Sequence, residues 1–182
     1  YGVDLSYGAN ATIDSNIFDW NRHSIAGDGR IGTSYTATNN IVYQHGNSHA
    51  FDMHGGADRQ DGTNIAGKTI VISNNTVHTI YHYWDFYPTQ YIYSAVVIRG
   101  VPTDGAYIHD NTFYYDNQNE VVSQINATGN MQVSNNTYCG KESTPRPPQM
   151  SSSTSWASGT YDLGPGHTGY NTAEFDLTVN DS

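Results

Sequence analysis

The sequence predicts an all-β fold: a single-stranded right-handed parallel β-helix, or β-solenoid, of about five to six rungs with a non-repeat C-terminal tail. Three observations predict it. A short strand-and-asparagine pattern recurs along the chain. Tyr, Asn, Thr, Ser and Gly are abundant, as short strands and tight turns require. Gly, Asn and β-branched residues recur too often for any long helix.

The repeat has five copies, each reading as a strand, a polar residue, an asparagine, a β-branched residue and an apolar residue. The copies are 11–18, 36–42, 70–77, 106–113 and 131–138. Their aligned asparagines, Asn16, Asn40, Asn75, Asn111 and Asn136, are 24, 35, 36 and 25 residues apart. A step near 24 is one rung, and the two longer steps contain an insertion of about 11 residues.

Each copy places two side chains inward, one three residues before the aligned asparagine and one two residues after it. The first set is Ile13, Ala37, Ile72, Ile108 and Val133, and the second is Phe18, Val42, Val77, Phe113 and Tyr138. At the bend, the aligned asparagine is expected to adopt left-handed backbone geometry and to bond the asparagine of the next rung. These asparagines are therefore predicted to be structural.

A second strand is expected in each rung, at 22–26, 48–54, 93–99 and 120–125, with Ile25 stacked on Phe51. Two insertions, 55–67 and 78–93, interrupt the repeat, and loops on a rigid scaffold often carry function. The predicted organisation is a β-helix over 1–139, a Pro/Ser-rich linker over 140–155 and a tail over 156–182. The tail packs on or caps the solenoid, or contacts a neighbouring subunit.

The charge balance excludes some partners. The formal net charge is −10, which disfavours nucleic acid and anionic membranes and is compatible with cations. No apolar run has the roughly 18 residues that a membrane span needs. Cys139 is the single cysteine, so no intrachain disulfide supports the fold.

One outer face concentrates ionisable residues. Strand alternation places Phe51 and Met53 in the core, so Asp52 and His54 are expected to point outward. Arg22 and Arg99 should reach the same face from neighbouring rungs, and the loop with Asp58, Arg59 and Asp61 leaves from His54.

This outer cluster permits three interpretations. His54 could act as a base with Asp52, while Arg22 or Arg99 neutralises a sugar carboxylate. Asp52, Asp58 and Asp61 could bind Ca²⁺. Alternatively, the same charges form an exposed ion-pair network that orders the glycine-rich loop.

Two further features have alternative interpretations. His23 and His49 share the core-side parity, which predicts a buried stacked pair. A zinc site of His23, His49 and Asp52 is the alternative, and the opposite parity of Asp52 argues against it.

The aromatic residues Tyr81, Tyr83, Trp84 and Tyr87, together with Arg59, suit sugar binding, a protein interface, or simple cover of the solenoid flank.

The Asn-Asn-Thr-Val/Phe/Tyr pattern at rung spacing resembles the right-handed parallel β-helix proteins of the pectin-lyase-like superfamily. Segments 23–26, 48–56 and 61–67 are similar to a signature in exported microbial β-helix proteins of unsettled function. The polygalacturonase-type motifs of that superfamily are absent from the chain. The resemblance implies an extracellular or cell-surface location, where Asn10, Asn74, Asn126, Asn135 and Asn180 would be glycosylation candidates.

The function predicted from these features is an exported module that binds or acts on polysaccharide. If the module is catalytic, the resemblance implies a cation-assisted polysaccharide lyase or a glycan hydrolase. The alternative is a structural subunit without catalysis, self-assembling with like subunits into a filament, sheath, surface layer or viral spike.

Overall fold

The computed structural model describes residues 1–43, 46, 48–79, 92–115, 121–140 and 158–162. Parallel strands dominate these residues, and the helical content described is one four-residue helix, α1 (Gly56–Arg59). The all-β prediction is therefore confirmed. No helix in the described ranges is both long and apolar enough to cross a membrane.

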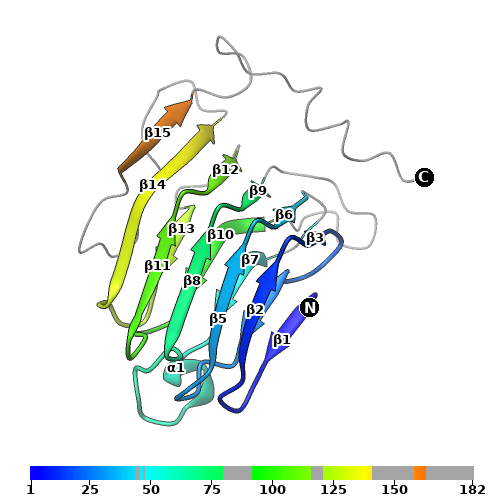
Figure 1. Ribbon diagram of the computed structural model, residues 1–182. Helices are drawn as coiled ribbons and strands as arrows, with labels where there is room; N and C mark the ends of the chain where they lie inside the picture. The colour runs from blue at the N-terminus through cyan, green and yellow to red at the C-terminus, as the bar shows by residue number, and fades with distance from the viewer. Residues whose placement is uncertain (44–45, 47, 80–91, 116–120, 141–157, 163–182) are drawn as a thin grey trace.

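The first sheet has five parallel strands (Figure 1). Its order is β1 (Val3–Leu5), β4 (Ile25–Gly27), β7 (Ser48–Met53), β10 (Ile92–Ile98) and β13 (Val122–Gln124). The last four strands coincide with the second strand expected in each rung, within a few residues at either end. β1 is a strand that the repeat did not predict.

The second sheet has ten strands in two arms. One arm is β2 (Asn10–Asp14), β5 (Ser34–Thr38), β8 (Thr69–Ser73) and β11 (Gly105–His109). The other is β3 (Ile17–Phe18), β6 (Ile41–Val42), β9 (Thr76–Thr79) and β12 (Thr112–Tyr115). The long strand β14 (Met131–Gly140) pairs with β11 and then with β12, and so joins the arms.

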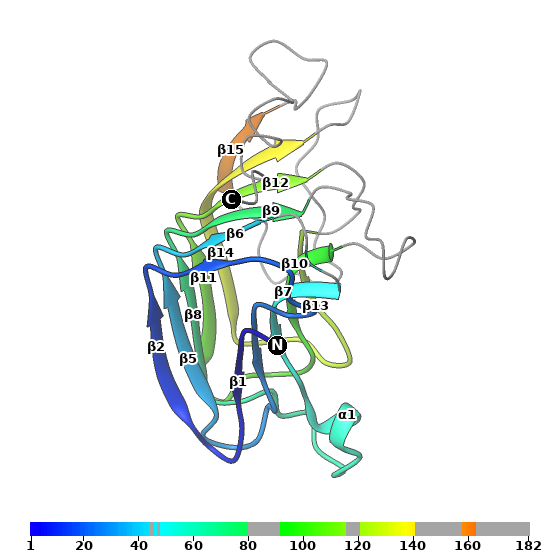
Figure 2. The same ribbon diagram turned by 90° about the vertical axis from the view of Figure 1, so that its right-hand side faces the viewer.

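The chain visits the first sheet and then both arms on every pass (Figure 2). Each strand lies parallel to the strand that the previous pass placed in the same sheet or arm. From the predicted tail, β15 (Ser158–Asp162) pairs in parallel with β14. The predicted linker lies almost entirely outside the described residues, so the domain boundaries remain predictions.

The bend between the arms is built on two adjacent residues. The Nδ2 group of Asn16, Asn40, Asn75 and Asn111 each donates to Oδ1 of the next aligned asparagine, at 2.9–3.2 Å. The predicted ladder is confirmed. The expected left-handed geometry belongs instead to the preceding residue, with φ of 56–58° at Ser15, Asn39, Asn74, Asp110 and Asn135. That residue turns the chain, and the next one is free to point its amide into the bend.

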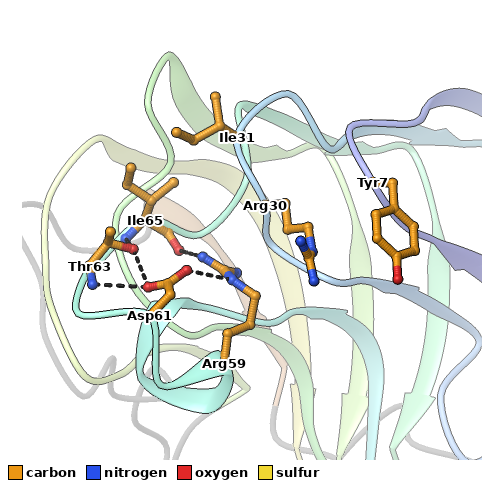
Figure 3. Close-up of a pocket in the computed structure, with 7 residues that line it drawn as sticks. All are labelled: Tyr7, Arg30, Ile31, Arg59, Asp61, Thr63 and Ile65. Carbon is orange, nitrogen blue, oxygen red and sulfur yellow. Dashed lines mark hydrogen bonds and ion pairs between the residues drawn. The ribbon is translucent and has the colours of Figure 1, made fainter.

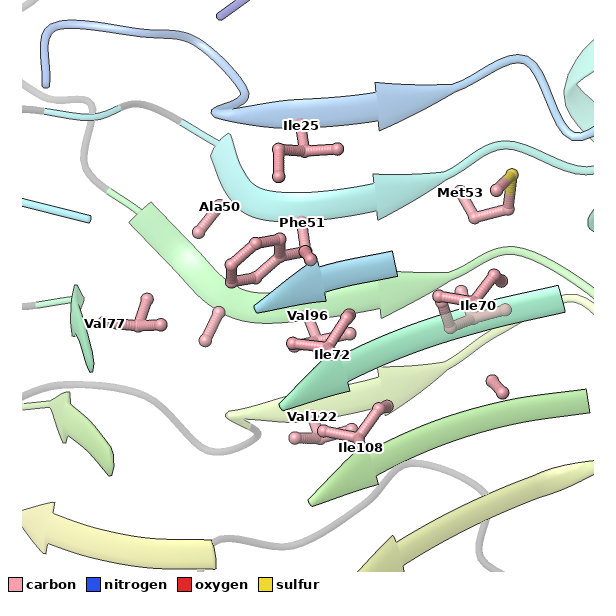
Figure 4. Packing of buried hydrophobic residues seen from close by; sticks show 14 of the residues in the cluster. Ile25, Ala50, Phe51, Met53, Ile70, Ile72, Val77, Val96, Ile108 and Val122 are labelled. Atoms are coloured by element: carbon pink, nitrogen blue, oxygen red, sulfur yellow. The ribbon is translucent and has the colours of Figure 1, made fainter. Parts of the chain in front are cut away.

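The core lies between the sheets and is built from stacks of side chains in register (Figure 4). Ile25, Phe51, Val96 and Val122 are successive partners across the first sheet, as expected for Ile25 and Phe51. All the predicted inward residues that the structure describes are buried, and the side chain of Tyr138 lies outside that set. Each fully buried Ile or Phe contributes roughly 1.5–3 kcal/mol.

The two insertions differ in how far they are described. Residues 55–67 form an ordered loop that contains α1, and an isolated bridge joins Ile65 to Val101. Most of the insertion at 78–93 lies outside the described residues, with β9 ending at Thr79 and β10 beginning at Ile92. Of the two insertions, the one at 55–67 can therefore be followed through its whole length.

Candidate functional site

Asp52 is the centre of a polar cluster beside the first sheet. Its neighbours in β7, Phe51 and Met53, are in the core, so its side chain leaves the outer face as predicted. The carboxylate is nevertheless 0% exposed, which the sequence did not indicate. It is buried because other polar side chains cover it from outside.

Arg99 is the strongest of these partners. Its Nε donates to Oδ1 of Asp52 and its Nη2 donates to Oδ2, both at 2.9 Å. Burial alone would lower the pKa of Arg99, but the hydrogen bonds and charge of Asp52 raise it overall. This two-point contact engages the guanidinium, so Arg99 acts as a partner of Asp52 rather than as a free cation for a sugar carboxylate.

His54 follows β7 and lies between two carboxylates. Its Nε2 is 3.4 Å from Oδ2 of Asp52, and its Nδ1 is 3.1 Å from Oδ2 of Asp58. A neutral imidazole has one N–H, so it can donate to only one of them and keeps one nitrogen as an acceptor. His54 is also partly exposed, with 31% of its side chain accessible.

His23 completes the cluster from the segment before β4. Its Nδ1 is 3.0 Å from the carbonyl oxygen of His49, and its ring stacks on that of His49 at 5.7 Å. The predicted pair is therefore present, and burial lowers the pKa of His23.

His23 and Asp52 are not on opposite sides of the sheet, as strand alternation predicted, because His23 Nε2 is 3.6 Å from Asp52 Oδ2. β4 begins only at Ile25, so strand alternation does not fix the direction of His23. The side chain is free to turn toward the outer face that carries Asp52.

The predicted calcium set of Asp52, Asp58 and Asp61 is not brought together. Asp61 accepts hydrogen bonds from Thr63 N and Oγ1 at 2.9 and 2.7 Å and from Arg59 Nε at 2.8 Å. The Thr63 hydroxyl is the main reason that the pKa of Asp61 falls to about 2. Asp58 pairs with His54 and Arg99, whereas Asp61 pairs with Arg59, so the two carboxylates have different partners.

Two glycines permit the close approach of these segments. A Cβ atom at Gly29, where φ is +71°, would collide with the carbonyl oxygen of His54, and one at Gly55 with that of Arg99. Larger residues there would push apart the turns that carry His54 and Arg99. The local sequence therefore supports the cluster geometry.

Two pockets lie beside the cluster and share Arg59. The larger, of 460 Å³, is lined by Tyr7, Arg30, Ile31, Arg59, Asp61, Thr63 and Ile65 (Figure 3). The smaller, of 260 Å³, is lined by Tyr1, Asp4, Ser6, Ala26, Asp28, His54, Asp58 and Arg59. Arg59 Nη1 donates to the Asp28 carbonyl oxygen at 2.8 Å, which fixes Arg59 between them.

Sequence reasoning missed Tyr1, Tyr7 and Arg30, which come from the first passes of the chain. The rung step was the available signal, since Ile31 lies 24 residues after Tyr7 in the same pocket. Arg30 lies over the Tyr7 ring, with its guanidinium carbon 4.7 Å from the ring centre. Cation and aromatic ring thus occupy one wall of the larger pocket.

The remaining predicted residues fall in different places. Arg22 is exposed, beside His23 in the chain. Tyr81, Tyr83, Trp84 and Tyr87 lie outside the described residues. The sequon residues Asn10, Asn74, Asn126 and Asn135 are exposed, and Asn180 lies outside the described set.

Comparison of the chain with protein-family models, with curated proteins and with solved structures finds no match.

Proposed function

We propose that the chain is a right-handed parallel β-helix module, exported to the cell surface or beyond, that binds acidic polysaccharide in the larger of its two adjoining pockets. The repeated visit to the first sheet and both arms supports the β-helix. The observation that carries the binding proposal is the half-exposed Arg30, which lies over the exposed ring of Tyr7 in the larger pocket.

The chemistry of the lining supports an acidic sugar. Aromatic rings offer flat apolar faces to sugar rings, and Tyr7 is 83% exposed. Guanidinium groups bind carboxylates through two parallel hydrogen bonds. Arg30 has half of its side chain exposed, and its Nε lies 3.3 Å from Asp28 Oδ2, from which a sugar carboxylate could displace it.

The net charge of −10 does not oppose this binding. At physiological ionic strength, exposed charges more than about 8 Å apart are largely screened from one another. The charges that line each pocket therefore decide the attraction of a uronate. Arg30 and Arg59 outweigh Asp61 in the larger pocket, whereas Asp4, Asp28 and Asp58 outweigh Arg59 in the smaller one. Binding is expected to weaken with added salt for the same reason.

The test measures affinity for polygalacturonate, alginate and a neutral glucan in the wild-type chain and in Arg30→Ala and Tyr7→Ala. Lys68→Ala is the matched control for charge, because Lys68 has similar exposure and pairs with Asp104 at 3.6 Å. Trp20→Ala is the control for an exposed aromatic residue. Neither Lys68 nor Trp20 lines the two pockets.

We expect Arg30→Ala to weaken binding of a polyuronate by roughly tenfold, the loss of one charge-assisted hydrogen bond. The two controls should bind as the wild-type chain does. Equal loss in pocket and control variants, or no binding of any glycan, contradicts the proposal. Unsaturated sugar products in the same samples would show that the protein cleaves the bound polysaccharide as a lyase does.

The second candidate function is a self-assembling structural subunit. The exposed large apolar residues of the described chain are Tyr1, Tyr7, Ile17, Trp20 and Ile31, all from its first passes. Within the described residues, β1, β2 and β3 pair on one side only, so the sheet edges there are open. Size-exclusion chromatography and negative-stain microscopy decide, since a strict monomer at high concentration contradicts assembly.

A further inference from the structure

Three ligand-type atoms converge in the cluster around Asp52. One atom each from His23, Asp52 and His54 lie within 4.8 Å of one another. His23 and Asp52 are 1% and 0% exposed, and His54 is 31% exposed. The set combines two imidazoles and one carboxylate, which are ligands typical of zinc and neighbouring transition metals.

The tautomer of His23 is fixed by its surroundings. A carbonyl oxygen only accepts, so the 3.0 Å contact with His49 requires the proton of His23 to be on Nδ1. The Nε2 atom of the neutral ring is then a lone-pair site. It has no hydrogen-bond partner among the described residues, although it is buried and faces Asp52 Oδ2 at 3.6 Å. A buried lone pair facing a carboxylate oxygen is unfavourable, and the conflict is removed either by a proton on Nε2 or by a metal ion between the two atoms.

We propose that His23 Nε2, Asp52 Oδ2 and His54 Nε2 bind one divalent transition-metal ion of the zinc type. Ligand atoms bonded at about 2.0–2.1 Å in a tetrahedron lie roughly 3.3–3.4 Å apart. The separations from Asp52 Oδ2 are 3.4 Å to His54 and 3.6 Å to His23. The ligand nitrogens of His23 and His54 lie within 4.8 Å of each other, so binding the ion brings the two imidazoles closer together.

The residues around the three ligands have the arrangement that orients a metal site. His23 donates Nδ1–H to a backbone carbonyl, and His54 directs Nδ1 at the Asp58 carboxylate at 3.1 Å. Such outer hydrogen bonds fix the ring and raise the basicity of the ligating nitrogen. Arg99 holds both oxygens of Asp52. Two carboxylates against one guanidinium leave a negative charge that a divalent cation compensates.

The ligand set excludes calcium as the preferred ion. Calcium takes six to eight oxygen ligands, whereas two of these three ligands are nitrogens. Three protein ligands leave a fourth tetrahedral position, and His54 is the member that lines the smaller pocket. Water or an anionic group from that pocket would complete the coordination. The site follows from its own geometry and does not depend on polysaccharide binding.

The test is a Zn²⁺ titration of the metal-stripped full chain, without glycan, by calorimetry and by thermal unfolding. We expect one equivalent to bind and to raise Tm, with Ca²⁺ failing to compete. His54→Gln and His23→Ala should weaken Zn²⁺ binding by roughly 100-fold or more. Asp58→Asn should weaken it by about tenfold, because loss of an outer partner costs about 10–100-fold.

The matched control is His109→Ala, because His109 and Asp110 form a surface pair at 2.7 Å, with 37% of the His109 side chain exposed. This variant should bind Zn²⁺ as the wild-type chain does. The visible absorption of bound Co²⁺ should be that of tetrahedral coordination. If His23→Ala does not fold, His54→Gln decides. No binding, equal binding in His54→Gln, or an octahedral Co²⁺ spectrum overturns the proposal.

Discussion

At the scale of single residues, each asparagine of the ladder is expected to stabilise the fold more, the more deeply its side chain is buried. Asn75 is 1% exposed, and its Oδ1 accepts from the backbone N–H and the Nδ2 group of Asn40. Its own Nδ2 donates to the carbonyl oxygens of Ala37 and Ser73 as well as to Asn111. Removing the amide would leave several buried polar groups without partners.

Asn75→Ala is therefore expected to lower the free energy of unfolding by about 3 kcal/mol or more, at roughly 1–3 kcal/mol per unsatisfied group. Asn16→Ala is the matched control, because Asn16 is the exposed first member of the ladder. Its loss should cost about 1 kcal/mol or less. Urea unfolding of both variants measures the difference, and equal losses would contradict a ladder stabilised by burial.

The sequence predicted the ladder but not which residue turns the chain. Asparagine suits both roles, and in Asn39-Asn40, Asn74-Asn75 and Asn135-Asn136 both positions hold it. The pairs Ser15-Asn16 and Asp110-Asn111 carry the distinction, because asparagine is constant only at the second position. The ladder needs an amide that donates and accepts, whereas the turn needs only tolerance of left-handed geometry.

At the scale of elements, the second arm carries an aromatic stack on its outer side. His78 of β9 stacks on Tyr114 of β12 at 4.9 Å and lies 6.1 Å from Tyr43, which follows β6. Burial lowers the pKa of His78 from 6.5 to about 4. As pH falls, the unfolded chain binds this proton before the folded chain does. The stability linked to His78 is therefore complete above pH 6.5 and is lost as pH falls toward 4.

His78→Phe is expected to reduce the pH dependence of stability in that window. Removing one titrating group should lower the slope by up to about 1.4 kcal/mol per pH unit. Other buried histidines titrate in the same direction, so a residual slope should remain. Chemical unfolding of both chains at several pH values between 4 and 7 is the measurement. If the free energy of unfolding falls equally with pH in the two chains, His78 does not cause this pH dependence.

The elements show why the candidate site was only partly predictable. Strand period correctly placed Phe51 in the core and Asp52 on the outer face. It could not show that His23, which precedes β4, turns toward Asp52. It also could not show how the loop at 55–67 folds, because hydrogen bonds between Asp61, Thr63 and Arg59 decide this and have no periodicity. Periodic features were predictable, and the irregular segments that complete the site were not.

At the scale of the whole molecule, the fold joins residues from distant passes into one polar cluster. His23, Asp52 and Arg99 come from three successive parts of the first sheet, and Asp58 comes from the loop between two of them. Stacking in register brings such residues together without a long-range loop. A metal ion held by two passes would link them in the folded chain only.

Metal binding should therefore stabilise the whole fold in a concentration-dependent way. An ion that binds only the folded chain adds about 2.7 kcal/mol at a free concentration one hundred times its Kd. Tm should rise with Zn²⁺ concentration in the wild-type chain and stay constant in His54→Gln. A Tm that responds equally in both chains would place the ion elsewhere.

The most direct measurement is anomalous diffraction at the zinc absorption edge from crystals of the chain grown with Zn²⁺. We expect one strong peak about 2.0–2.2 Å from His23 Nε2, His54 Nε2 and an oxygen of Asp52. A map without a peak there, in which His23 Nε2 instead bonds a water molecule or Asp52 directly, would contradict it.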